Sequence, residues 1–147
     1  MDASKVYLVQ TDTTVGFLSN DDKKLTAIKQ RPQTQKILQV VESFQTLKTQ
    51  VRVPQKFKNH VRRAKNTTFI YPNQTSFRVI PSDNVHYNFI KKFKKMYSTS
   101  ANLTQHHFDE TFAKEHADII VEDKNGFFEA ASSRLIKLSC TKIKKLR

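Results

Sequence analysis

The sequence predicts a single α/β domain over residues 1–147, built on a twisted mixed β-sheet with flanking helices. Three observations predict it. Short β-rich runs alternate with helical segments, and capping or turn residues separate them. Leu, Ile, Val and Phe supply 40 of the 147 residues, enough for a thin hydrophobic core. The length is that of one domain, since domains usually have roughly 100 to 200 residues.

In the first half of the chain, Pro and capping residues mark the ends of the expected elements. Ser19 to Asp22 supply caps and first-turn acids for a helix, which must end near Arg31 because Pro32 follows. Pro54 precedes a basic helix. The expected elements are a strand at 6–9, a Thr-rich turn at 11–14, a helix from about 19 to 31, a strand at 37–41, and helices at 43–48 and 55–65.

The second half begins with a predicted hairpin of strands 67–71 and 76–80, joined by Pro72, Asn73 and Gln74. Asp83 is expected to cap a helix that runs to residue 96. Its inward-facing residues would be Val85, Phe89, Ile90, Phe93 and Met96. The remaining expected elements are a strand at 97–99, a helix at 109–117, and strands at 119–121 and 135–138 before a basic tail.

The net charge of +13 is concentrated in two blocks of the sequence. Residues 43–82 hold eight basic residues and no acid, and residues 134–147 hold six basic residues and no acid. Residues 96–133 reverse the sign, with seven acids against two bases. Such blocks are typical of a surface that binds phosphate, either in a polymer or in a nucleotide. A merely solvated basic face and a basic membrane-binding helix are the alternatives.

Several classes of protein are excluded or disfavoured. The chain has only two glycines, Gly16 and Gly126, so it has no Gly-rich phosphate loop. Adjacent His106 and His107 would point apart on a helix, and we expect no metal site. Cys140 is the only cysteine, which excludes an internal disulfide, and we expect it to be a small buried side chain. No signal-peptide core or apolar run of about 20 residues is present, so we expect a cytoplasmic protein without a membrane segment.

Three short segments place hydroxyls, amides or cations where strands meet helices, which is where open α/β sheets bind ligands. The first is a hydroxyl-rich elbow at 11–17, the second is Lys29-Gln30-Arg31-Pro32, and the third is the strand end at 98–102 with Ser100 and Asn102. Taken alone, each has a simpler explanation. Ser100 and Asn102 could cap a following helix, and Lys29 and Arg31 could complement the dipole of theirs.

Taken together and in this order, the segments resemble the YrdC-like family of threonylcarbamoyl-adenylate synthases. That family has a strand followed by Thr-Asp-Thr and a Gly, then Lys-x-Arg-Pro, and much later Thr-Ser-x-Asn. The matching residues here are 11–13 with Gly16, 29–32, and 99–102. Residues 78–81 resemble the family's Arg-Val-Pro segment with one insertion, and 133–138 are similar to its late Ser-Thr-Val-Val-Asp-Leu strand. The resemblance spans nearly the whole chain.

The resemblance implies a nucleotidyltransferase that condenses L-threonine, bicarbonate and ATP into L-threonylcarbamoyladenylate, with Mg²⁺ carried by the nucleotide. The product serves tRNA threonylcarbamoyladenosine (t6A) modification, and family members also bind tRNA or double-stranded RNA. By motif, Lys29, Arg31, Ser100 and Asn102 would be catalytic residues in a concave basic cleft. Arg78 would be a further phosphate or carboxylate contact, and Thr13 and Ser133 would be hydroxyl contacts for threonine.

These residues suit such a reaction because it gathers carboxylate, bicarbonate and triphosphate in one pocket, where cations and oriented donors offset the negative charge. The alternative is a non-catalytic YrdC-like protein that binds RNA through its basic surface only. The expected partners are tRNA or double-stranded RNA and a t6A transferase protein that would accept the adenylate.

Overall fold

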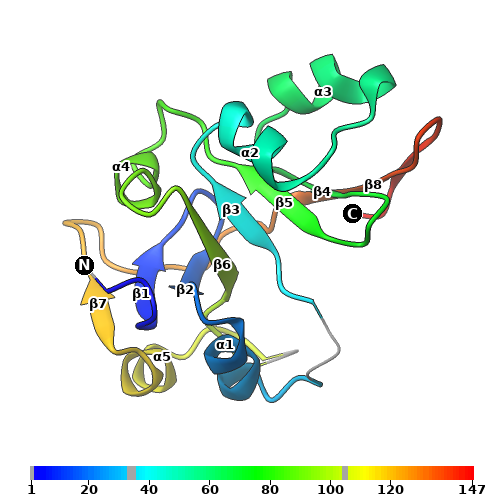
Figure 1. Ribbon diagram of the computed structural model, residues 1–147. Helices are drawn as coiled ribbons and strands as arrows, with labels where there is room; N and C mark the ends of the chain where they lie inside the picture. The colour runs from blue at the N-terminus through cyan, green and yellow to red at the C-terminus, as the bar shows by residue number, and fades with distance from the viewer. Residues whose placement is uncertain (1, 33–35, 104–105) are drawn as a thin grey trace. The chain divides into compact units, whose positions relative to one another are not determined.

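The computed structural model describes residues 2–32, 36–103 and 106–147 (Figure 1). It has the mixed α/β fold that the sequence predicts. The chain folds into two compact units. The first unit comprises Met1–Ile37 and Met96–Ser132, and the second comprises Leu38–Lys95 and Ser133–Arg147. That residues 1–147 form one domain stays a prediction, and each unit is described by itself.

The first unit contains four strands in the order β7-β1-β2-β6. The strands are β1 (Tyr7–Gln10), β2 (Val15–Ser19), β6 (Lys95–Ser100) and β7 (Ile119–Val121). β2 runs antiparallel to both β1 and β6, whereas β7 runs parallel to β1. Two helices accompany them, α1 (Asp22–Lys29) and α5 (Glu110–His116). The core includes Leu8, Phe17 and Leu25, each with no exposed surface.

The second unit contains five strands in the order β3-β5-β4-β8-β9. The strands are β3 (Gln39–Val41), β4 (Thr67–Ile70), β5 (Ser76–Val79), β8 (Arg134–Leu138) and β9 (Ile143–Lys145). β4 pairs antiparallel with β5 as the predicted hairpin and parallel with β8. The helices are α2 (Phe44–Gln50), η1 (Gln55–Phe57), α3 (Lys58–Arg63) and α4 (Tyr87–Ile90). The parallel β4–β8 pair joins the basic C-terminal segment to the basic middle of the chain.

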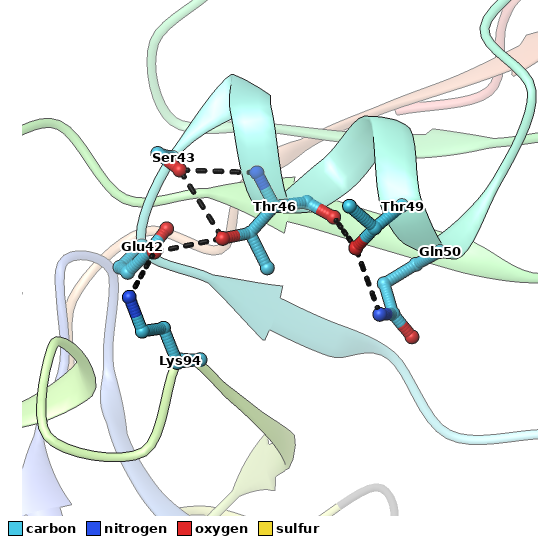
Figure 2. Close-up of polar contacts among 6 residues, drawn as sticks. All are labelled: Glu42, Ser43, Thr46, Thr49, Gln50 and Lys94. Carbon is cyan, nitrogen blue, oxygen red and sulfur yellow. Dashed lines mark hydrogen bonds and ion pairs between the residues drawn. The ribbon is translucent and has the colours of Figure 1, made fainter.

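A polar network fixes the start of α2 (Figure 2). Ser43 caps the helix, accepting a 3.1 Å hydrogen bond from the amide of Thr46, and the Thr46 hydroxyl donates to Glu42 Oε1 at 2.7 Å. Lys94 Nζ lies 3.7 Å from the same carboxylate oxygen. Glu42 is only 8% exposed, so this acid contributes little to the surface of the second unit.

Two strands, β2 and β9, were not predicted from the sequence. β2 lies where the Thr-rich turn was expected to lead into a helix, because Thr11–Thr14 closes a β-hairpin through a 3.3 Å bond from Thr11 N to Thr14 O. A Cβ at position 16 would lie 2.9 Å from Thr99 O, so the close contact between β2 and β6 requires a glycine there. The same glycine weakens the sequence pattern that would predict a strand. β9 forms where a basic tail was expected.

The helix predicted from Asp83 to Met96 is wrong in extent. A turn from Pro81 to Asn84 precedes it, the helix covers only Tyr87–Ile90, and Lys94 has a left-handed φ of 69° that ends the helical path. Met96 is buried, but on β6.

Two burial predictions are also wrong. Val85 is 80% exposed, because it belongs to the turn region before the short helix α4. Cys140 is exposed, because it lies in the turn between β8 and β9. Among the described residues, no helix is long and apolar enough to cross a membrane.

Candidate functional site

Lys29 is the centre of a cluster of polar residues in the first unit. It occupies the last turn of α1, which Asp21 caps at the start by accepting from Lys23 N, and which ends at Gln30 in a left-handed conformation. Leu25, one turn earlier on the same face, is fully buried in the core. Burial of that face directs Lys29 inward, and its side chain is only 2% exposed.

The Lys29 ammonium is held by the end of strand β6. Nζ donates to Ser100 O at 2.9 Å, to Ser100 Oγ at 3.2 Å, and to Asn102 Oδ1 at 3.1 Å, with a further short contact to Asn102 O. The amide nitrogen of Asn102 donates to His106 O. A buried ammonium needs such oxygens, since an unpaired buried charge is costly. Lys29 therefore links the end of α1 to Ser100 and Asn102.

Arg31 lies close enough to Lys29 for their charges to interact. Burial, with the nearby Arg31 cation as a second cause, lowers the pKa of Lys29 to about 8. Burial also lowers the pKa of Arg31. Arg31 Nε is buried and has no hydrogen-bond partner among the described residues, whereas Lys29 Nζ is surrounded by oxygens. An anion would therefore find its unsatisfied donor on Arg31.

Thr13 belongs to the tight turn between β1 and β2. Its amide donates to Thr11 Oγ1 at 3.1 Å, and the Thr11 hydroxyl donates to Thr14 O at 2.5 Å. Thr14 Oγ1 accepts from Ala130 N at 3.2 Å, which fixes the same turn to the segment after β7. Thr13 is partly exposed, so its hydroxyl is presented from a well-fixed backbone.

Arg78 and Ser133 meet in the second unit. Arg78 Nη1 donates to Thr68 Oγ1 at 3.4 Å, and Thr68 Oγ1 lies 2.7 Å from Ser133 Oγ. Arg147 donates through Nε to Ser133 O at 2.9 Å. Arg78, Thr68 and Ser133 are each less than 5% exposed.

Sequence reasoning missed Thr68 and Arg147 in this group. The signal for Thr68 was its place in the predicted strand 67–71, which forms a hairpin with the strand that holds Arg78. No comparable signal marked Arg147, since its contact depends on β9 turning back along β8. The structure thus joins Lys29, Ser100 and Asn102 directly, with Arg31 beside them and Thr13 elsewhere in the same unit. That both groups line one basic cleft stays a prediction.

The charge is divided sharply between the units. The second unit holds 18 basic and 2 acidic residues, a net charge of +16, while the first unit holds 8 basic and 11 acidic residues, a net charge of −3. Of the two acids in the second unit, Glu42 is buried, and Asp83 forms an ion pair in which Oδ2 lies 3.9 Å from Lys65 Nζ. No group of three or more His, Cys, Asp or Glu side chains could hold a metal ion within residues 2–32, 36–103 and 106–147.

Comparison with known proteins places the chain in a family. The Sua5/YciO/YrdC family model, described as telomere recombination, matches residues 1–147. The chain belongs to this family. Among curated proteins, no relative matches the sequence.

Solved structures agree on the fold. Sua5 of P. abyssi, solved in complex with L-threonine, has a TM-score of 0.81 and 17% identity over 98% of this chain and 50% of that one. E. coli YciO has a TM-score of 0.75 and 17% identity over 98% of this chain and 82% of that one. MTH1692 from Methanobacterium thermoautotrophicum has a TM-score of 0.71 and 18% identity over 98% of this chain and 80% of that one. The chain thus spans about half the length of the Sua5 structures.

Proposed function

We propose that this protein is an L-threonylcarbamoyladenylate synthase that acts in t6A modification of tRNA. Family membership supports a role related to t6A, and the Sua5 structure similar in fold was solved with L-threonine bound. The observation that carries the proposal is the junction of Lys29 with Ser100 and Asn102, because it joins residues of two family motifs that lie 71 and 73 positions apart in the sequence. The proposal places the protein in the cytoplasm, where ATP and threonine are available.

The chemistry needs positioning and charge compensation rather than covalent catalysis. The threonine nitrogen bonds to the bicarbonate carbon with loss of water, and a carbamate oxygen bonds to the α-phosphorus of ATP as pyrophosphate leaves. Mg²⁺ would accompany the nucleotide and neutralise its phosphates.

In this proposal each residue of the group has its own task. Lys29 holds the β6 end in place, and Arg31, whose Nε has no partner among the described residues, binds an anionic part of the substrates. Ser100 and Asn102 supply oriented polar groups. Thr13, Arg78 and Ser133 would be further contacts to threonine or phosphate.

The direct test measures pyrophosphate release with ATP, L-threonine and bicarbonate, omitting each in turn. We expect release only when all three are present, and a loss of roughly 100-fold or more in Arg31→Gln and Asn102→Ala, as for removal of an oriented donor at a reacting centre. Lys23→Gln, an exposed lysine on the same helix, is the matched control and should keep full activity. Release that does not require threonine would refute the proposal.

The second candidate function is nucleic-acid binding without catalysis, and the +16 charge of the second unit favours it. On this basis we propose tRNA or double-stranded RNA as the partner. If the protein is the enzyme proposed first, a t6A transferase protein would be a second partner, which accepts the adenylate. A salt titration of tRNA binding tests it, since each phosphate contact adds to the slope of log K against log salt. Salt-sensitive binding in a protein without threonine-dependent turnover would favour the second candidate alone.

A further inference from the structure

A pocket of about 350 Å³ opens on the second unit, among residues with no part in the groups around Lys29 and Arg78. Three segments build it: residues 51–55 after α2, Pro72 and Asn73 in the β4–β5 turn, and Cys140 in the β8–β9 turn. Its volume lies at the lower end of the range usual for small-ligand sites, roughly 300 to 1,000 Å³.

The pocket combines apolar walls with a few polar groups. Val51, Pro54 and Pro72 supply apolar surface, and Arg52 and Asn73 supply polar groups. Asn73 Oδ1 already accepts from Thr75 N at 3.1 Å, which orients the side chain and leaves its amide nitrogen to donate. This combination suits a flat, partly polar ring, with its faces against the walls and its edge on the amide and guanidinium groups.

The surroundings of the pocket are basic. Lys56 Nζ donates to Thr141 O at 3.1 Å and so ties η1 to the turn that carries Cys140. Lys142 follows in the same turn, and Arg52 is exposed at the pocket itself. Residues 43–82 and 134–147, which contribute every lining residue, contain no acid. A group bound in this pocket would thus have cations within reach of any phosphates attached to it.

We propose that this pocket binds one unpaired base of a single-stranded nucleic acid, while the basic residues around it bind the adjoining phosphates. The inference rests on the nucleic-acid binding proposed above and narrows it to a site and a strand state. A base in a duplex is stacked and paired, and cannot enter a pocket, whereas loops and ends offer splayed bases to side chains such as Arg and Asn. Phosphate contacts give affinity, and the pocket gives preference for unpaired strands.

The test compares fluorescein-labelled heptauridylate, the matching thymidine DNA heptamer, and a blunt-ended RNA duplex without a loop, by fluorescence anisotropy at several salt concentrations. Cys140→Trp fills the pocket without changing charge, and Asn73→Ala removes the amide. Gln45→Trp, on the exposed side of α2, adds the same ring elsewhere and is the control. Thermal melting checks that each variant is folded.

We expect wild type to bind a heptamer more tightly than the duplex. Cys140→Trp and Asn73→Ala should weaken heptamer binding about tenfold and leave the salt slope and duplex binding unchanged, because a tenfold loss is about the scale of one lost hydrogen bond. The tighter of the RNA and DNA heptamers identifies the natural strand. Heptamer binding unaffected by both variants, or tighter duplex binding, overturns this inference alone. Failure of wild type to bind any of the three probes overturns the proposed nucleic-acid binding as well.

Discussion

The burial of the Lys29 ammonium makes a specific prediction about stability at alkaline pH. The pKa of Lys29 is about 8 in the folded protein, against an ordinary value of 10.5. Between these two values the unfolded chain holds a proton on Lys29 that the folded protein has lost. Stability therefore rises with pH across this window, and Lys29 contributes no pH dependence of stability below or above it.

The size of the effect follows from the same two values. A difference of about 2.5 pH units corresponds to about 3 kcal/mol at 1.36 kcal/mol per unit. Lys29→Met keeps the length and apolar stem of the side chain but cannot titrate. The free energy of unfolding of wild type minus that of Lys29→Met should therefore rise by up to about 3 kcal/mol between pH 8 and pH 10.5.

Urea unfolding followed by circular dichroism at several pH values between 7 and 10.5 measures this difference. Other groups titrate in both proteins and cancel in the subtraction. Lys23→Met removes an exposed lysine from the same helix and controls for the loss of one positive charge. A difference that stays flat or falls as pH rises would show that burial does not disfavour the Lys29 ammonium, and would refute the lowered pKa of Lys29.

Two further predictions concern packed positions. Gly16→Ala should lower the free energy of unfolding by about 1–3 kcal/mol, because the new Cβ would lie 2.9 Å from the backbone oxygen of Thr99; an unchanged thermal midpoint would contradict this. Tyr71→Phe should raise stability by about 1 kcal/mol, because the buried Tyr71 hydroxyl has no hydrogen-bond partner among the described residues. Urea unfolding measures it, and a loss of stability would show that the hydroxyl is satisfied.

The order of the motifs, rather than any periodicity, led to the prediction that Lys29, Ser100 and Asn102 belong to one site. Pro32 indicated the end of α1, and Ser100 and Asn102 were expected at a strand end, where the structure has them. What the sequence could not predict is the direction of the Lys29 side chain. That direction depends on Leu25 packing into the core one turn earlier, which is a property of the assembled unit.

The missed strands have a common physical cause. β2 contains Gly16, and β9 is a three-residue edge strand with two lysines, so local strand propensity is weakened in both. Each is a strand only because a neighbour pairs with it, β1 and β6 in one case and β8 in the other. The exposed position of Cys140 follows from the same error, since the β8–β9 turn exists only if β9 does.

The charge blocks of the sequence acquire a structural meaning only through the strand order. Between the basic blocks 43–82 and 134–147 lies the acid-rich segment 96–133. The parallel β4–β8 pair nevertheless brings both basic blocks into the second unit. The acidic block folds with the first unit, where its strand β7 pairs with β1. Charges of one sign are thus brought together at a cost in mutual repulsion. A phosphate-bearing partner would offset that repulsion on binding, which is the physical reason to seek the nucleic-acid contact on the second unit.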